Sequence, residues 1–219
     1  MNRKKIDLEP GLYFVATPIG HARDITLRAI DILESADVLA AEDTRSLRRL
    51  LDIHAIAINK RPLIAYHDHS KEAARNRIML LLHEGKSVAY MSEAGTPLIA
   101  DPGYQLTQSA IREGIPLTSA PGCSAILPAL ILSGLPTDRF LFEGFLPSNK
   151  SARCNRLQEL RDLEATLIIY EEPKRLAAML RDACGTLGKD RPAAFCRELT
   201  KKFEEVQRGT LKHLLALTE

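Results

Sequence analysis

One loop of this sequence combines residue types that could hold a ligand. The stretch "VAYMSEAGTPLIADPGY" (residues 88–104) passes from an apolar, strand-like segment into a loop with Glu93 and Asp101, two glycines and two prolines. Glycine lets the backbone approach a ligand closely, and proline stiffens a loop. The loop is poor in basic residues, so it suits a cationic or hydroxyl-rich ligand better than a phosphorylated one. The alternative is an ordinary turn that follows a parallel strand.

The glycine motifs that bind nucleotide phosphates are missing from the sequence. The first strand-following loop, "TPIG" (residues 17–20), has one glycine instead of a GxGxxG pattern, and Pro18 removes a backbone donor that a phosphate would need. No GxxxxGK[ST] motif occurs in the chain. His67 and His69 form a lone HxH pair, which is more often a polar loop than a metal site. We therefore expect neither a phosphate-binding loop nor a bound metal.

A second segment, "AEDTRSLRRLLD" (residues 41–52), has the pattern of an amphipathic helix that begins at residue 44. Its leucines fall on one face and its arginines on the opposite face. The arginines either form a solvated surface or meet the phosphates of RNA. A further basic helix carries Lys150, Arg153 and Arg156 at helical spacing. The candidate RNA-binding residues are the arginines of the first helix and two basic residues that follow it: Arg45, Arg48, Arg49, Lys60 and Arg61.

Bulk composition limits the class of protein. The chain has 219 residues, 45% of them hydrophobic, so it can bury a substantial core in one large domain or two small ones. Its 30 Lys and Arg against 28 Asp and Glu leave a net charge of +2, so an anionic partner must be met by local clusters. The four cysteines form no CxxC pair, which indicates reduced thiols and a cytoplasmic protein. The longest apolar run, "AILPALIL" (residues 125–132), is less than half the ~20 residues that span a bilayer, so no membrane segment is expected.

Short apolar segments alternate with amphipathic ones, which predicts an α/β fold with largely parallel sheets. The strands predicted in the first half are residues 12–16, 38–41, 63–66, 87–91 and 115–120. The helices predicted there are residues 26–35, a helix from residue 44, residues 70–83 and residues 105–113. The last two helices should end at Gly85 and Gly114, which suit a left-handed cap.

After about residue 120 the alternation starts again. It predicts strands at residues 140–146, 165–172, 193–199 and 202–209, and helices at residues 150–161 and 173–184. We therefore expect two α/β domains, residues 1–122 with a parallel sheet and a smaller domain of residues 123–219. Clefts between domains are preferred ligand sites, so the cleft between these two is the expected place for a ligand.

Five motifs of the chain resemble those of the tetrapyrrole methylase superfamily. They are "LYFVATPIGHARDITLRAIDILESADVLAAEDTRSLRRLL", "SEAGTPLIADPGYQL", "APGCSA", "SGLPTDRFLFEGFLP" and "RELTKKFEEVQRGTL", in the order and spacing of that family. The resemblance covers nearly the whole chain and implies two α/β domains of the class III methyltransferase type, with S-adenosylmethionine in the cleft, and a homodimer. Full-length members continue beyond "RGTL" with a C-terminal segment that this sequence is expected to lack.

The resemblance also implies which residues hold the cofactor. S-adenosylmethionine carries a sulfonium, an ammonium, a carboxylate and a ribose but no phosphate, which fits loops poor in basic residues. The matching positions are Thr17, Pro18, Gly20, Ser92, Glu93, Ala94, Gly95, Thr96, Pro97, Pro121, Gly122, Cys123, Ser124, Ala125, Tyr170 and Leu199.

Within the superfamily, the chain is most similar to enzymes that methylate a ribose 2'-oxygen of a cytidine in 16S rRNA of the small ribosomal subunit. The alternatives are methylation of a tetrapyrrole ring carbon and a non-catalytic relative that binds cofactor or RNA. For ribose methylation, Glu42 and Asp43 are candidate bases because they follow a strand end, and Arg45 would orient them. Asp43 could instead cap the helix that follows it.

Overall fold

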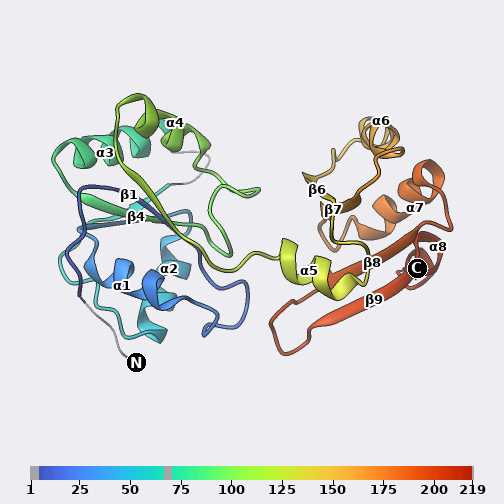
Figure 1. The fold of residues 1–219 in the computed structure, drawn as a ribbon, viewed down its shortest axis with the longest axis horizontal. Coiled ribbons are helices and arrows are strands. Elements are labelled where there is room, and N and C mark those ends of the chain that lie inside the picture. Colours follow the sequence, from blue (N-terminus) through green and yellow to red (C-terminus); the bar gives the residue numbers. More distant parts are fainter. Residues whose placement is uncertain (1–4, 67–70, 219) are drawn as a thin grey trace. The chain divides into compact units, whose positions relative to one another are not determined.

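The computed structural model describes residues 5–66 and 71–218, so His67 and His69 lie outside the described residues. The chain forms two compact units, Met1–Ser124 and Ala125–Glu219 (Figure 1). The domain boundary that we expect from the sequence, after residue 122, stays a prediction. No helix among the described residues is long and apolar enough to cross a membrane.

A parallel sheet of five strands forms the centre of the first unit. Its order is β3-β2-β4-β1-β5, and every neighbouring pair is parallel. Two of the interior strands, β2 and β4, are buried along their whole length, as expected for a sheet covered on both faces. The strands are β1 (Gly11–Val15), β2 (Val38–Ala41), β3 (Leu63–Ala65), β4 (Ser87–Met91) and β5 (Leu117–Ala120).

Helices cover both faces of this sheet, which gives three layers (Figure 1). One face packs against α1 (Leu27–Ser35) and α2 (Thr44–Ile53), and the other against α3 (Lys71–His83) and α4 (Tyr104–Arg112). Glycine follows α3 and α4 as predicted, because Gly85 and Gly114 adopt φ angles of +76° and +69°. The first unit therefore confirms the predicted parallel α/β sheet.

Arg61 has a structural role in this unit. Its guanidinium donates to carbonyl oxygens at the end of α1, including those of Leu33 at 2.6 Å and Ala36 at 3.1 Å. The same group also donates to the Ala57 carbonyl at 2.6 Å and the Ile58 carbonyl at 3.1 Å. The last carbonyls of a helix have no partner within it, so a cation at the end of α1 is favourable. The structure thus directs Arg61 inward, although the sequence suggested an RNA contact.

The second unit combines a parallel and an antiparallel pair of strands. Strands β6 (Phe140–Phe145) and β7 (Thr166–Tyr170) are parallel, whereas β8 (Pro192–Arg197) and β9 (Glu205–Thr210) form an antiparallel hairpin. This hairpin is the antiparallel exception, among the described strand pairs, to the largely parallel sheets predicted from the sequence. The strand predicted at 202–209 starts later because a turn, with hydrogen bonds from Lys201 N to Glu198 O and from Glu204 N to Lys201 O, precedes it.

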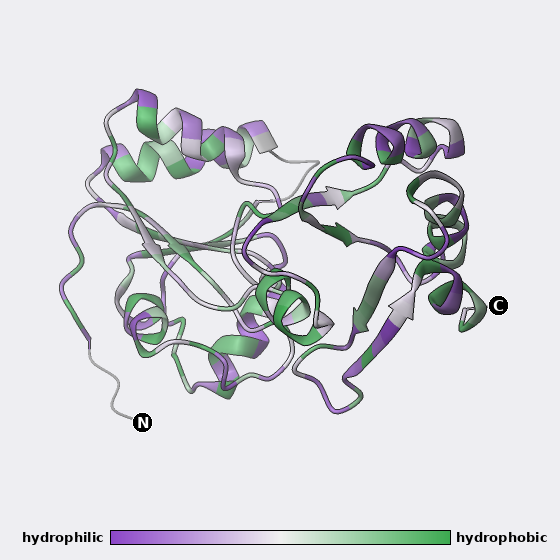
Figure 2. Ribbon diagram, turned by 45° about the vertical axis from the view of Figure 1, so that its right-hand side comes forward, coloured by the Kyte–Doolittle hydropathy of each residue, from purple (hydrophilic) through white to green (hydrophobic). Residues whose placement is uncertain are grey.

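Four helices complete the second unit: α5 (Ile126–Ser133), α6 (Lys150–Leu160), α7 (Leu176–Leu187) and α8 (Leu211–Ala216). The apolar run singled out in the sequence forms α5, which is hydrophobic along most of its length (Figure 2). Pro128 lies in its first turn, where the missing N–H has no helical partner to lose. Gly134 ends the helix in the left-handed conformation, with φ +72°.

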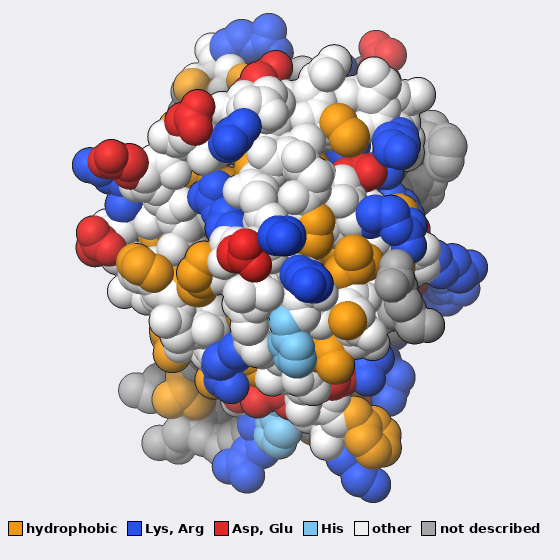
Figure 3. Space-filling view, turned by 90° about the vertical axis from the view of Figure 1, so that its right-hand side faces the viewer, with side chains coloured by type: hydrophobic (Ala, Val, Ile, Leu, Met, Phe, Trp, Pro, Cys, Tyr) orange, Lys and Arg blue, Asp and Glu red, His pale blue; other side chains and the backbone are white. Residues whose placement is uncertain are grey.

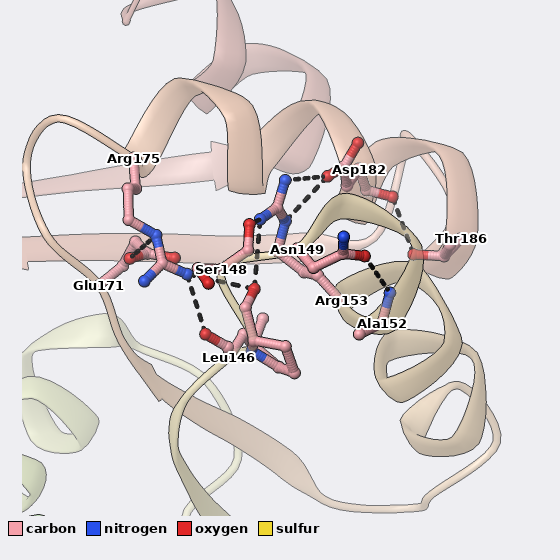
Figure 4. Close-up of polar contacts among 10 residues, drawn as sticks. Leu146, Ser148, Asn149, Ala152, Arg153, Glu171, Arg175, Asp182 and Thr186 are labelled. Carbon is pink, nitrogen blue, oxygen red and sulfur yellow. Dashed lines mark hydrogen bonds and ion pairs between the residues drawn. The ribbon is translucent and has the colours of Figure 1, made fainter.

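A buried ion pair joins α6 to α7 (Figure 4). Arg153 donates to Asp182 Oδ2 through Nε at 2.8 Å and Nη2 at 2.6 Å, and both side chains are only 7% exposed. Arg153 also donates to the carbonyls of Pro147 at 3.2 Å and Ser148 at 2.9 Å. The sequence suggested a basic helix surface here, but Arg153 is an internal connector between helices and the loop that precedes them.

We expect Asp182→Ala to destabilise the protein by ~3–5 kcal/mol, because it leaves the Arg153 charge buried without a counter-charge. The control is Glu159→Ala, which breaks the exposed Arg156–Glu159 contact of 2.6 Å and should cost at most ~1 kcal/mol. Urea denaturation of both variants measures the difference. Equal losses would show that the buried pair contributes no more than a surface one.

Candidate functional site

Two loops at the carboxyl edge of the parallel sheet are hydrogen-bonded to each other. β1 and β4 are neighbours in the sheet, so the loops that follow them start side by side. Thr17 N donates to Gly95 O at 2.9 Å, and Gly95 N donates to Thr17 O at 3.0 Å. The buried Ser92 hydroxyl also donates to Gly95 O, at 2.9 Å. The predicted residues Thr17, Ser92 and Gly95 are therefore in one place.

The loop after β5 is attached to the same structure. Thr96 Oγ1 donates to the Cys123 carbonyl at 2.8 Å, and the Cys123 thiol lies 2.8 Å from the Asp24 carbonyl. Burial is the main cause that raises the pKa of the Cys123 thiol, so it stays protonated near neutral pH. Three loops predicted to bind the cofactor thus form a single hydrogen-bonded group at the sheet edge. They contain the matching residues 17–20, 92–97 and 121–124.

Two glycines in these loops are required by close contacts within the protein. A Cβ atom at Gly122 would lie 2.9 Å from Ala16 Cβ. A Cβ atom at Gly95 would lie 3.3 Å from Ile19 Cγ2, and Gly95 also has a φ of +87°. The sequence suggested that these glycines make space for a ligand. The structure shows that they let the loops approach one another.

Asp43 is the N-cap of α2, which was the alternative to its role as a base. Asp43 Oδ1 accepts from Arg45 N at 2.7 Å and from Arg45 Nε at 3.2 Å, and Oδ2 accepts from Arg45 Nη2 at 3.0 Å. The Arg45 guanidinium, followed by the Arg45 backbone N–H, holds the pKa of Asp43 below its usual value. A carboxylate that is this well satisfied is a weak proton acceptor. Glu42, at the end of β2, is half-buried.

Charged residues also connect the loops after β2 and β4, which are adjacent strands. The hydrogen bond to Asp43 is the main cause that raises the pKa of Arg45, and the negative charge of Glu93 adds to it. Glu93 in turn acts on Asp101 in its own loop. Burial, with a smaller contribution from Glu93, raises the pKa of Asp101 to about 6. The sequence placed Asp101 in the loop but did not single it out, because burial of one carboxylate cannot be read from residue types.

The remaining predicted residues lie at strand ends or helix starts in the second unit. Ala125 precedes α5. Tyr170, the last residue of β7, makes edge-to-face contacts with Phe142 at 4.8 Å and Phe145 at 5.6 Å between ring centroids. Leu199 follows β8 and is 9% exposed. Each of these two residues thus belongs to a packed part of the second unit.

Beside Tyr170, a carboxylate holds the ends of β6 and β7 together (Figure 4). Glu171 Oε1 lies 3.2 Å from Arg175 Nε, and Arg175 Nη2 donates to the Leu146 carbonyl at 2.9 Å. The Glu171 side chain is 4% exposed. These contacts fix the backbone on either side of Tyr170.

The predicted arginine face is present on α2. Leu47 and Leu51 are buried in the core, whereas Arg45, Arg48 and Arg49 are exposed. Lys60 is exposed as well. The face shown in Figure 3, in contrast, has Lys and Arg side chains interspersed with Asp and Glu.

Residues 11–215 match the family model described as tetrapyrrole (corrin/porphyrin) methylases. The chain belongs to the tetrapyrrole methylase family. A relative from Mesorhizobium japonicum named ribosomal RNA small subunit methyltransferase I is 51% identical over 207 residues, which cover 94% of this chain and 69% of the relative. A relative of the same name from Halalkalibacterium halodurans is 50% identical, over 92% of this chain and 68% of its own.

The fold of this methylase is also that of a solved cobalamin biosynthetic enzyme, cobalt precorrin-4 methyltransferase. The TM-score is 0.70 at 18% identity, over 94% of this chain and 88% of the other. Family membership confirms the predicted class III methyltransferase fold and the predicted methyltransferase activity. It also supports S-adenosylmethionine as the methyl donor.

We expect Gly122→Ala to lower the free energy of unfolding of the methylase by ~1–3 kcal/mol, because the new Cβ overlaps Ala16 and forces the loops apart. Gly185→Ala, in α7, is the matched control: nothing lies within 4 Å of the new Cβ, so it should stabilise by ~0.5–1 kcal/mol. Urea denaturation of both variants gives the two values. A neutral Gly122→Ala would show that the loops after β1 and β5 move freely.

Proposed function

We propose that the chain transfers a methyl group from S-adenosylmethionine to the ribose 2'-hydroxyl of a cytidine in 16S rRNA. The observation that carries this proposal is the identity of about half of all aligned positions to proteins named ribosomal RNA small subunit methyltransferase I. The structural similarity to the cobalamin biosynthetic enzyme, at 18% identity, supports the fold alone. The rRNA proposal is therefore favoured over methylation of a tetrapyrrole carbon.

The loops at the sheet edge fit the chemistry of this methyl donor. When bound, S-adenosylmethionine supplies a methyl group on a positively charged sulfur, and it has no phosphate. Residues 17–20, 92–97 and 121–124 contain neither Lys nor Arg, and Glu93 brings a negative charge to their edge. We assign these residues, with Ala125, Tyr170 and Leu199, to cofactor binding. The main task of the loops is to align donor and acceptor, since alignment can supply several of the ~7–11 kcal/mol available from positioning.

The substrate side of the proposal rests on the exposed basic residues of α2 and its flank. Arg45, Arg48, Arg49 and Lys60 would contact phosphates and orient the RNA without reading its sequence. Because only 5% of the residues are aromatic, base stacking contributes little, and recognition depends on the shape of an assembled RNA. We accordingly propose that the substrate is the assembled small ribosomal subunit in the cytoplasm. From the family resemblance we also propose a domain boundary between residues 122 and 123, and a homodimer.

Methyl transfer is tested directly with S-adenosylmethionine labelled in its methyl group and small ribosomal subunits that lack the modification. We expect label in 16S rRNA, and nuclease mapping should place it on a ribose 2'-oxygen of a cytidine. Label on a base, or in an added tetrapyrrole instead of RNA, would refute the proposal. Calorimetric binding of the donor without any transfer would identify a non-catalytic relative.

The double substitution Arg48→Glu and Arg49→Glu should weaken binding to the small subunit and lower the dependence of binding on salt. The variant would make fewer phosphate contacts, so fewer counterions would be released on binding. We expect the slope of log K against log salt concentration to fall by about 1 per arginine. Arg45 is left intact because it holds Asp43. The matched control is Arg77→Glu with Lys86→Glu, exposed positions on and after α3, across the sheet. An equal loss in both double variants would refute a specific role for α2.

A further inference from the structure

Asp101 occupies an unusual position among the carboxylates of the site. It lies in the loop between β4 and α4, at the carboxyl edge of the sheet, and its side chain is half-buried. Among the residues that the structure describes, no hydrogen bond or ion pair to its carboxylate is found, and the charge that acts on it is that of Glu93. The same charge of Glu93 contributes to the raised pKa of Arg45, at the start of α2. Asp101 is thus partly withdrawn from water without a cation beside it.

The backbone around Asp101 is held firmly. Tyr90 is fully buried in β4, and its hydroxyl donates to the Pro102 carbonyl at 2.8 Å. Leu98 and Ala100 adopt positive φ angles of 71° and 60°, which are rare for residues other than glycine. Such strained conformations persist only where the surroundings enforce them, and they cluster at functional sites. The loop therefore presents the Asp101 carboxylate from a defined backbone position.

The two aspartates at the sheet edge have opposite environments. Asp43 is neutralised by Arg45 and its carboxylate already accepts three hydrogen bonds. Burial and the charge of Glu93 raise the pKa of Asp101 to about 6, whereas Arg45 lowers that of Asp43. The Asp101 carboxylate is therefore a better proton acceptor than an ordinary aspartate and is still mostly ionised near neutral pH. Pairs of acids whose surroundings separate their pKa values in this way commonly divide their roles in a reaction.

We propose that Asp101 is the general base that accepts the proton of the ribose 2'-hydroxyl during methyl transfer. The inference rests on the proposed function. In the step, the bond between ribose oxygen and methyl carbon forms as the bond between that carbon and sulfur breaks, and the electron pair stays on sulfur. The hydroxyl proton passes to an Asp101 carboxylate oxygen and then to water. Asp43 and Arg45 position the adjoining loop.

The test begins with single-turnover methylation of small ribosomal subunits as a function of pH. For the wild type, the rate should fall at acidic pH with an apparent pKa near the value of about 6 for Asp101. Asp101→Asn should lower the rate ~10²–10⁴-fold and remove this acidic limb. Calorimetry should show its affinity for S-adenosylmethionine within about twofold of wild type, because a base acts in the transition state. Asp7→Asn, an exposed aspartate before β1 at the opposite sheet edge, is the control and should behave as wild type.

Two further measurements keep the proposal falsifiable. Carbon-13 NMR of the protein without ligand should show Asp101 titrating well above a normal aspartate, and Glu93→Gln should move that titration to lower pH, since it removes the negative charge that raises it. Glu42→Gln tests the carboxylate that follows β2, the strand next to β4, and its single-turnover rate should still fall at acidic pH.

Wild-type rates in Asp101→Asn, or a normal Asp101 titration, would overturn the base assignment. Loss of the limb in Glu42→Gln alone would transfer the role to Glu42. If the wild type methylates no small subunit, the proposed function fails instead.

Discussion

The candidate site depends on the pair of backbone hydrogen bonds between Thr17 and Gly95. Parallel pairing of β1 with β4 brings the two loops to the same edge, and this pair joins them beyond the strands, together with a hydrogen bond from Thr17 Oγ1 to the Ser92 carbonyl at 3.4 Å. Gly95 can make it because glycine tolerates a φ of +87°. Thr96, the next residue, then reaches Cys123, so the third loop depends on the same contact. A change at any of these positions is therefore felt by all three loops.

At this edge of the sheet, the pKa of each aspartate depends on whether its carboxylate is paired with a cation. Arg45 satisfies Asp43, whereas Asp101 is half-buried and faces the negative charge of Glu93. An aspartate thus caps a helix in the loop after β2, as Asp43 does, and is a stronger base in the loop after β4, as Asp101 is. Hydrogen bonds from Arg45 lower the pKa of Asp43, whereas burial, with a smaller contribution from Glu93, raises the pKa of Asp101.

In the second unit, which has no large sheet, the buried Arg153 and the partly exposed Arg175 hold segments together. Arg153 links α6, α7 and the preceding loop through Asp182, and Arg175 links the ends of β6 and β7 through Glu171 and Leu146. A guanidinium can serve several carbonyl and carboxylate acceptors at once, so it suits loop ends with unpaired carbonyls. These contacts set the backbone around Tyr170, one of the residues assigned to the cofactor.

The sequence by itself determined the features that depend on neighbours along the chain. Periodic apolar residues gave the parallel sheet, the amphipathic helix α2 and the glycine ends of α3 and α4, and the motifs identified the family. Tertiary structure decided the inward role of Arg61, the antiparallel hairpin of β8 and β9, the packing of Gly122 on Ala16 and the raised pKa of Asp101. The roles of Arg61, Gly122 and Asp101 depend on burial or on contacts between residues far apart in the chain, which no local pattern encodes. The hairpin depends on how two consecutive strands pair, which their apolar residues do not specify.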